Sequence, residues 1–577
     1  MRFLPIGPYP RNVSSDKVRE LIANYWQHGI SRHQLLQVLV DLQHNFGWIS
    51  PSAIEILSDS VDLSAGEITG IIDFYHFLRI KQPSAWQIYL STNITDMMLD
   101  QNNNLRTLIE FAESHPEKLS VNTTSCTGLC EQGPALLING FAISKLNPAR
   151  IQQILNLIQQ ETQFDRWPEQ LFSIPETILA SGPLLGHTVN PGELREKITK
   201  QGNHYFLEQL KLSGLQGRGG AAFNTFFKWQ SCIAVPADKK YVVCNADEGE
   251  PGTFKDRVLL NSKIDNVLEG MSICAEVIGA THGFIYLRNE YLFLVNHIQN
   301  AIDSRRKSGL FGENFDIEIH LGAGAYICGE ESALLESLEG KRGIPRIRPP
   351  FPVSHGYLQQ PTVVNNVETF CNIALIADFG ADKFREAGTK ASPGTKLHSI
   401  SGDCPSPGIV ELPLGATIKE ALLLVDAKNA VYVQVGGPSG KLIHKDQFHL
   451  PLDFENIHTG GSLMVFNESR SISDILSNYM QFFSEESCGF CTPCRVGTAV
   501  IDSKMKKITS QQAGKNDIDL IIQTSDLLSA ASHCGLGKAA GDCARQIIND
   551  FHVPMNNSIS DDFVGEEIAR QIDRVTQ

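Results

Sequence analysis

Four cysteines near the C-terminus have the spacing of a metal-cluster site. Cys488, Cys491 and Cys494 are each separated by two residues on a segment that also holds a glycine and a proline, and Cys534 follows further along the chain. Three thiolates on such a loop can converge on one face of a cluster, and a distant fourth can complete it. The C-x2-C-x2-C run is the usual sequence form of a cubane [4Fe–4S] site, whereas a zinc site normally offers two pairs. The quartet therefore predicts electron transfer.

A glycine-rich segment over 214–223 leads into a predicted helix over 225–229. Glycines let the backbone approach a phosphate or a flat ring closely, and the amides at the start of a helix favour an anion. Arg218 and Lys228 add positive charge to this segment. On its own it is a weak signal, because many glycine turns only reverse the chain. It is not a P-loop, because no Gly-Lys-Ser/Thr follows.

An acidic loop follows a predicted buried strand over 241–244. Its first residue, Asn245, can both donate to and accept from a planar heterocycle. Asp247, Glu248 and Glu250 can accept hydrogen bonds from ribityl or ribose hydroxyls, or from an amide. For this segment taken alone, a solvated acidic turn remains the simpler interpretation.

Further candidate contacts lie after the predicted strand over 317–320. Segment 322–332 is rich in glycine and acids, and segment 340–352 is rich in arginine and proline, which together suit a nucleotide with hydroxyls and phosphates. Phe223 and Phe351 are candidates for stacking on aromatic rings, although packing is the commoner role of such a side chain. The adjacent amides of Asn365 and Asn366 form one plausible clamp on a cofactor.

The elements that would position these residues form several regions in a chain of 577 residues. Ser64 and Glu67 form a capping box before a helical stripe, and a strand over 86–90 opens a mixed segment. Strands alternate with helices around the glycine-rich and acidic loops, which is typical of an α/β sheet with its site at the strand ends. We predict helical structure over 1–85, mixed α/β over 86–165, a proline-dotted linker over 166–195, α/β over 196–390, a small β-rich domain over 391–470 and helices over 471–577.

Composition narrows the class of protein. The formal net charge of −15 argues against nucleic acid as a partner. No apolar run reaches the ~18–20 residues needed to cross a bilayer, which argues against membrane insertion. The N-terminal residues lack the apolar core of a signal peptide, so we expect a cytoplasmic protein whose thirteen cysteines are mostly reduced.

Four motifs together resemble the NADH-binding flavoprotein subunit of respiratory complex I. They are Gly-Arg-Gly-Gly-Ala-x-Phe at 217–223, Asn-Ala-Asp-Glu-x-Glu-Pro-Gly at 245–252, Gly-Ala-Tyr-x-Cys-Gly-Glu-Glu at 324–331 and Ser-Cys-Gly-x-Cys-x-Pro-Cys-Arg at 487–495. The resemblance extends over about 180–545, and the conjunction of motifs is specific although each glycine motif alone is not. It implies a Rossmann-like FMN/NADH domain, a β-grasp (ubiquitin-like) domain and a C-terminal helical bundle with one [4Fe–4S] cluster.

Carried over position by position, the resemblance implies two sets of contacts. Expected FMN contacts are Gly217, Gly219, Lys228, Asn245, Asp247, Tyr326, Gly329, Glu330, Asn365 and Asn366. Expected NADH contacts are Phe223, Glu248, Glu250, Glu331 and Phe351, with Glu248 as the candidate catalytic residue. The sequence departs from the family at Arg348, where lysine is usual, and at Ser231, where an adenine-stacking aromatic is common.

The N-terminal third resembles the small thioredoxin-like partner subunit of that flavoprotein. The partner binds a [2Fe–2S] cluster through a C-x4-C pair and a C-x3-C pair. Cys126 and Cys130 match the second pair, whereas Ser91 and Asp96 occupy the positions of the first. Two thiolates cannot complete the usual four-ligand site, which leaves oxygen ligands as the alternative. We therefore expect this second cluster to be absent, and the whole fold to be multidomain α/β with a thioredoxin-like domain after the N-terminal helices.

Such a fusion resembles the diaphorase α-subunit of NAD-reducing [NiFe] hydrogenases. This resemblance implies hydride exchange between NAD(H) and FMN, followed by single-electron relay through the [4Fe–4S] cluster to an Fe–S protein subunit and hydrogenase subunits of a hetero-oligomer. Alternatives are the corresponding subunit of complex I or of an NAD-dependent formate dehydrogenase. A different class is a non-catalytic electron-transfer subunit, against which the intact Glu248, Glu250 and Glu331 argue.

Overall fold

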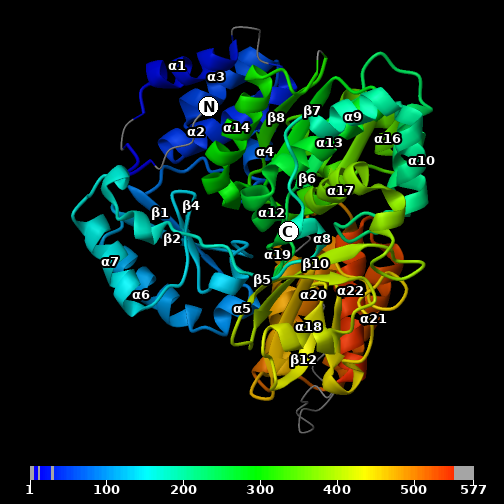
Figure 1. Cartoon of the computed structure of the whole chain (residues 1–577). Coiled ribbons are helices and arrows are strands. Elements are labelled where there is room, and N and C mark those ends of the chain that lie inside the picture. Colours follow the sequence, from blue (N-terminus) through cyan, green and yellow to red (C-terminus); the bar gives the residue numbers. More distant parts are fainter. Residues whose placement is uncertain (1–5, 11–12, 27–30, 313, 552–577) are drawn as a thin grey trace.

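A computed structural model describes residues 6–10, 13–26, 31–312 and 314–551 of the chain (Figure 1). Four α-helices lie between residues 15 and 72 of the stretch predicted as helical over 1–85, and its residues 1–5, 11–12 and 27–30 lie outside the described part of the chain. Ser64 and Glu67 form the expected capping box, in which the Glu67 amide donates to Ser64 Oγ. Ile68, Ile71 and Ile72 are buried on one helix face. These helices are α1 (Ser15–Trp26), α2 (Leu35–Phe46), α3 (Pro51–Val61) and α4 (Ala65–Ile72).

A four-stranded sheet of order β2-β1-β3-β4, here called the N-terminal sheet, follows. β1 runs parallel to β2 and antiparallel to β3, and the predicted strand over 86–90 is β1. In Figure 1 this sheet and its helices α6 and α7 lie on the left side of the molecule. Its elements are β1 (Trp86–Ser91), β2 (Leu119–Thr124), β3 (Leu136–Ile138) and β4 (Phe141–Ile143), with α5 (Ile94–Met97), α6 (Gln101–Ser114) and α7 (Pro148–Gln159).

The central sheet is parallel throughout, with order β8-β7-β6-β9. The strands predicted over 241–244, 284–287 and 317–320 are confirmed as β6 (Tyr241–Ala246), β7 (His282–Leu287) and β8 (Asp316–Leu321). β9 (Thr362–Asn366) pairs on the other side of β6, so the strand order reverses between β6 and β9. Open parallel sheets bind ligands at the carboxyl ends of their strands at such a switch point.

Helices cover both faces of the central sheet (Figure 1). The predicted helix over 225–229 is confirmed and extends to Ile233. The helices of this region are α8 (Pro183–Gly186), α9 (Glu193–Gln201), α10 (Asn203–Ser213), α11 (Thr225–Ile233), α12 (Lys255–Ser262), α13 (Ile264–Ile278), α14 (Leu292–Lys307), α15 (Glu331–Leu338), α16 (Pro352–His355) and α17 (Val367–Phe384).

A third sheet has the order β13-β12-β14-β10-β11-β5, and its neighbours β10 and β14 run parallel. The edge strand β5 comes from the proline-dotted stretch before the central sheet, so this stretch also contributes to a sheet. The elements are β5 (Ile178–Ala180), β10 (Thr395–Gly402), β11 (Gly408–Pro413), α18 (Ile418–Leu424), β12 (Ala430–Val435), β13 (Lys441–His444) and β14 (Ser462–Asn467).

Four helices complete the described chain: α19 (Ile472–Glu485), α20 (Thr492–Thr509), α21 (Lys515–Ala531) and α22 (Gly535–Asp550). Cys488 and Cys491 lie between α19 and α20, Cys494 lies in the first turn of α20, and Cys534 immediately precedes α22. None of the helices in the described ranges has the length and apolar character needed to cross a membrane.

Candidate functional site

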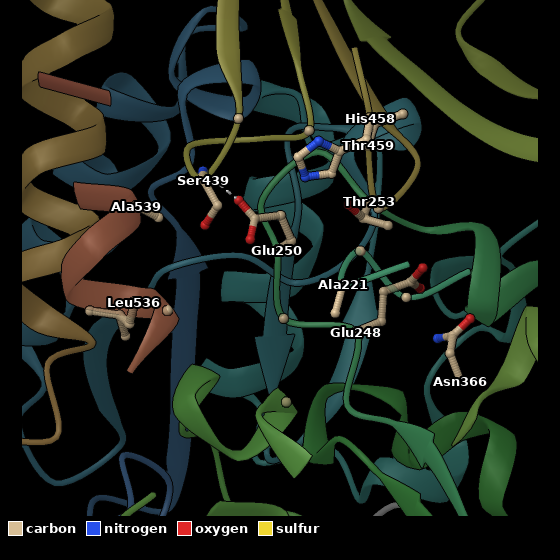
Figure 2. A pocket seen from close by; sticks show the side chains of 18 of the residues that line it. Ala221, Glu248, Glu250, Thr253, Asn366, Ser439, His458, Thr459, Leu536 and Ala539 are labelled. Carbon is tan, nitrogen blue, oxygen red and sulfur yellow. Dashed lines mark hydrogen bonds between the residues drawn. The ribbon is translucent and has the colours of Figure 1, made fainter. Parts of the chain in front are cut away.

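A cavity of about 570 Å³ lies at the switch point between β6 and β9. Its walls come from the glycine-rich loop, the acidic loop, the segment after β8, the third sheet and the start of α22. Figure 2 shows Glu250 beside Ser439, on the side of Leu536 and Ala539 of α22, and Glu248 beside Ala221, on the side of Asn366. The predicted site residues that line it are Gly219, Asn245, Asp247, Glu248, Glu250, Tyr326, Gly329, Glu330 and Asn366.

The other predicted cofactor residues lie outside this lining: Gly217, Phe223, Lys228, Glu331, Phe351 and Asn365. The side chains of Phe223 and Phe351 are more than half exposed. Asn365 is buried, and its Oδ1 accepts a hydrogen bond of 3.2 Å from the Trp229 indole. The sequence-based contacts thus separate into an inner group at the cavity and an outer group beside it.

Charged side chains of the outer group contact one another. Lys228 on α11 donates to Glu331 at 2.9 Å and to the Val364 carbonyl at 2.9 Å. Arg348 lies 3.2 Å from Glu330 and 3.5 Å from Glu331. Arg348, which stands where the family has lysine, therefore links the cavity residue Glu330 to the outer group.

Glu248 is held by donors on both carboxylate oxygens. Oε1 accepts from the Asp256 amide at 2.8 Å, and Oε2 accepts from the Arg257 amide at 3.1 Å and from the Tyr291 hydroxyl at 2.9 Å. Burial, with a further contribution from the charge of Asp256, raises the pKa of Glu248 to about 7. The buried Arg288 also donates to the Glu248 carbonyl, which fixes the backbone of the acidic loop.

Glu250 bridges the central and third sheets. Its carboxylate accepts from the Ser439 amide at 2.8 Å and from the Tyr326 hydroxyl (Figure 2 marks its bond to Ser439). Burial raises the pKa of Glu250 to about 7 and also raises the pKa of Tyr326. At neutral pH the cavity therefore holds carboxyl groups that are close to their titration midpoints.

The donor and acceptor set of the cavity fits a flavin nucleotide. The Oδ2 atom of Asp247 is buried and has no hydrogen-bond partner among the described residues, so it can accept from a ligand hydroxyl. A Cβ at Gly219 would lie 3.1 Å from the Asn366 side chain, and one at Gly329 would lie 3.2 Å from the Asp247 carbonyl. Glycine at these positions leaves space for a ring or a phosphate to approach the backbone.

Several lining residues were missed by the sequence analysis. Lys255 is 1% exposed, and its Nζ contacts Asp256 at 2.6 Å, Glu368 at 3.0 Å and the Asn366 amide oxygen at 3.2 Å. The only sign of Lys255 in the sequence was its position directly after the acidic loop. Ser439 and the segment 456–460 carried no motif, because tertiary packing alone brings the third sheet to the cavity.

The four C-terminal cysteines line one small cavity together with Ile327, Pro345, Ser487, Phe490, His533 and Leu536. Cys491 is the N-cap of α20 and Cys534 is the N-cap of α22, so two positive helix ends face the thiol groups and favour thiolates or an anionic cluster. In the described ranges no three His, Cys, Asp or Glu side chains converge as for a single metal ion. A cubane holds four thiolates apart around its own core, so this donor set fits a cluster.

The cysteine pair of the N-terminal sheet has a different environment. The sulfur atoms of Cys126 and Cys130 are 3.5 Å apart, and both residues are buried. Ser91 and Asp96, the two positions without cysteine, are also fully buried. The Asn93 amide contacts the side chains of all four. The structure thus brings together the four positions that the family resemblance selects.

Fold and site together define an FMN-dependent NADH dehydrogenase module with an iron–sulfur cluster. The family model described as Nuo51 FMN-binding domain matches residues 210–375. The model described as NADH-ubiquinone oxidoreductase-F iron-sulfur binding region matches 474–557, and a thioredoxin-like [2Fe-2S] ferredoxin model matches 18–159.

Individual relatives narrow the family further. The chain is 38% identical to the NAD-reducing hydrogenase HoxS subunit alpha of Cupriavidus necator over 539 residues, which cover 88% of each chain. It is 39% identical to a subunit of the NADH-quinone oxidoreductase of Mycobacterium tuberculosis over 59% of this chain and 82% of the relative. A crystal structure of NAD+-reducing [NiFe]-hydrogenase in the H2-reduced state superposes with a TM-score of 0.88 at 36% identity, covering 95% of this chain and 97% of that one. The chain belongs to the family of NAD-reducing hydrogenase alpha subunits, and it is an NAD(H)-dependent flavin iron–sulfur oxidoreductase.

Proposed function

We propose that this chain is the diaphorase subunit of an NAD-reducing hydrogenase. It would exchange hydride with NAD(H) at the cavity and pass electrons one at a time through the cysteine quartet to partner subunits. FMN supplies the hydride and single-electron chemistry when it is bound. The residues of the chain bind and orient the cofactor and the nucleotide, and exclude water from them.

One observation carries this proposal. Ile327 and Leu536 line both the 570 Å³ cavity and the small cavity of the four cysteines. A group bound in the first cavity would therefore be separated from a cluster in the second by these shared side chains. Close packing between two redox centres is what an electron relay requires.

Roles for individual residues follow from their positions. We assign cofactor binding to the residues of the inner group, in which Asp247 offers an acceptor and Asn245 orients the loop by donating to the Gly329 carbonyl at 2.8 Å. Glu248 and Glu250 would accept from the nucleotide. The exposed Phe223 and Phe351 would stack on its adenine once it is bound. Cys488, Cys491, Cys494 and Cys534 would be the cluster ligands.

Domain limits form part of the proposal. Apart from β5, the third sheet has five strands, β10 to β14, which lie in the order fourth, third, fifth, first and second, with α18 between the second and third along the chain. This order, with parallel first and fifth strands, supports a β-grasp domain over 391–470. We propose the other limits as 1–85, 86–165, 166–195, 196–390 and 471–577.

The partners would be an Fe–S subunit and hydrogenase subunits in a hetero-oligomer, working in the cytoplasm. The match to the hydrogenase subunit of Cupriavidus necator covers 88% of this chain, whereas the match to the NADH-quinone oxidoreductase subunit covers 59%. This difference in coverage favours hydrogenase over the complex I alternative.

The test is purification of the native complex through this chain. We expect nickel in the complex, and NAD+ reduction that depends on H2 and not on formate. NADH–dye reductase activity of the flavin-loaded chain separates an enzyme from a non-catalytic electron-transfer subunit. Molybdenum with formate-dependent activity, or quinone reductase activity without nickel, would contradict the hydrogenase assignment.

A further inference from the structure

The centre of the Cys126 site is filled by a side-chain amide. Asn93 Nδ2 lies 3.1 Å from Ser91 Oγ, 3.1 Å from Asp96 Oδ2, 3.3 Å from Cys126 Sγ and 3.5 Å from Cys130 Sγ. These four atoms belong to the positions that would ligate a [2Fe–2S] cluster. Two of them are oxygen atoms, and the amide nitrogen lies among all four. The residues present therefore do not fit that cluster.

The orientation of this amide is fixed by its other end. Asn93 Oδ1 accepts from the Asp96 amide at 3.0 Å and from the Thr95 hydroxyl at 2.6 Å, so the NH2 group must point toward the sulfur atoms. Burial raises the pKa of Asp96, which keeps its carboxyl protonated and makes it a poor ligand for iron. What remains at the site is a pair of thiols.

The two thiols differ in reactivity. Three neighbouring groups lower the pKa of Cys126. They are the hydrogen bond from Cys130, the nearby Arg288 guanidinium, and the Gly128 amide, which donates to Cys126 Sγ at 3.3 Å. The same hydrogen bond, together with burial, raises the pKa of Cys130. A stable thiolate beside a protonated thiol is the arrangement of a dithiol that exchanges with disulfides.

Cys126 is buried, but it borders a cavity that exposed residues also line. It lines a second cavity of about 550 Å³ whose lining includes the exposed residues Asp73, His76 and Glu485. Cys130 does not line this cavity. A small molecule that enters the cavity therefore reaches Cys126 before Cys130.

We propose that Cys126 and Cys130 form a reversible disulfide at the site where relatives of the N-terminal domain hold a cluster. The Cys126 thiolate attacks one sulfur of a low-molecular-weight disulfide, which releases one small thiolate and leaves a mixed disulfide. Cys130 then loses its proton and attacks the Cys126 sulfur, which releases the second small thiolate. Two protein thiols are oxidised and the small disulfide is reduced to two thiols. The sulfur atoms need to approach from 3.5 Å to about 2.05 Å, so only a local shift is required.

The test uses the full-length holoprotein equilibrated with mixtures of reduced and oxidised glutathione, followed by alkylation and mass spectrometry. Both cysteines fall in one tryptic peptide, because no Lys or Arg separates them. We expect oxidation to lower the amount of the doubly alkylated peptide by at least about tenfold. In its place a peptide should appear that is two hydrogen masses lighter than the peptide with two free thiols. Dithiothreitol should reverse the change. Two thiols that remain fully alkylatable in oxidised glutathione would overturn the proposal.

Single variants test the order of attack. We expect Cys130→Ser to accumulate a glutathione adduct on Cys126, and Cys126→Ser to leave Cys130 free, because only Cys126 of the pair lines the cavity. Cys404→Ser removes a partly exposed cysteine elsewhere in the chain and should leave the peptide result unchanged. An adduct on Cys130 in the Cys126→Ser variant would overturn the assignment of Cys126 as nucleophile. Since none of these readouts involves NADH, a failure here is separate from a failure of the diaphorase proposal.

Discussion

The cysteine quartet at the C-terminal helices and the cysteine pair of the N-terminal domain are two versions of a cluster site in one chain. At the quartet, four thiols surround a small cavity and two helix N-termini face it. At the pair, two thiols remain, and the amide of Asn93 fills the centre. The quartet's cavity also shares Ile327 and Leu536 with the cofactor cavity, which places it next to the flavin site.

From this difference we infer that the quartet carries electrons and that the loop of the pair supports the acidic loop. The loop of the pair is tied to the acidic loop of the active site: Arg288 donates to the Cys126 carbonyl at 2.7 Å and to the Glu248 carbonyl, and Arg257 pairs with Glu131. The loop that carries the pair therefore also supports the acidic loop.

The largest effect should come from the quartet. We expect Cys491→Ser to abolish the [4Fe–4S] EPR signal while FMN stays bound, and to slow electron transfer from NADH to a one-electron acceptor protein at least about a hundredfold, because the relay loses a ligand. The matched variant Cys126→Ser should leave the iron content and this signal unchanged. Persistence of the cluster signal in Cys491→Ser would refute the ligand assignment.

Rebuilding the pair should restore a cluster only when the amide is removed. In the triple variant, Ser91→Cys and Asp96→Cys are combined with Asn93→Ala. We expect this variant to gain about two iron atoms per chain after anaerobic reconstitution, because four thiolates then surround an open centre. The same double cysteine variant with Asn93 in place is the control and should gain none. Equal iron contents in the two variants would show that Asn93 does not block the site.

The structural role of the pair's loop is tested at the buried ion pair between Glu131 and Arg257. Glu131→Gln leaves a buried guanidinium without its charge partner, and we expect the free energy of unfolding to fall by about 3 kcal/mol in denaturant titration. The double variant with Arg257→Met should recover part of this loss. If Glu131→Gln left the denaturant midpoint of unfolding unchanged, the ion pair between Glu131 and Arg257 would not anchor the loop of the pair.

A smaller effect should appear in the pH dependence of kcat/KM for NADH, and it comes from Glu250 in the cavity. The pKa of Glu250 is raised to about 7, so its carboxylate becomes available to the nucleotide as pH rises through this value, and kcat/KM for NADH should rise with it. Glu250→Gln should make the profile less steep, because Glu248, whose pKa is also raised to about 7, still titrates, and it should lower kcat/KM about tenfold at pH 8. Cys404→Ser, which removes a partly exposed cysteine that does not line the cavity, should leave the profile as it is, and an unchanged profile in Glu250→Gln would contradict the role of Glu250.

The same carboxyl has an effect on stability with a defined sign. Because the folded chain holds the Glu250 proton more tightly than the unfolded chain does, its contribution to the free energy of unfolding falls as pH rises from about 4.5 to about 7. Glu250→Gln should remove this part of the pH dependence in chemical unfolding experiments. A dependence that is identical in both proteins would contradict the raised pKa.

Local features of the fold were readable from the sequence, and remote contacts were not. The β6, β7 and β8 strands, the capping box of α4 and the cysteine spacing are set by residues close together in the chain. Ser439 and Leu536 reach the cavity from segments far along the chain, and no local pattern marks them. Asn93 was missed for the same reason: its importance depends on Cys126 and Cys130 packing around it, which requires β1 and the loop after β2 to be adjacent.

The most direct test of this account is the iron, acid-labile sulfide and FMN content of the purified full-length chain, measured together with the EPR spectrum of its reduced form. We expect about four iron and four sulfide per FMN, with a [4Fe–4S] signal alone. About six iron per FMN, with an additional [2Fe–2S] signal that is lost in Cys126→Ser, would contradict it.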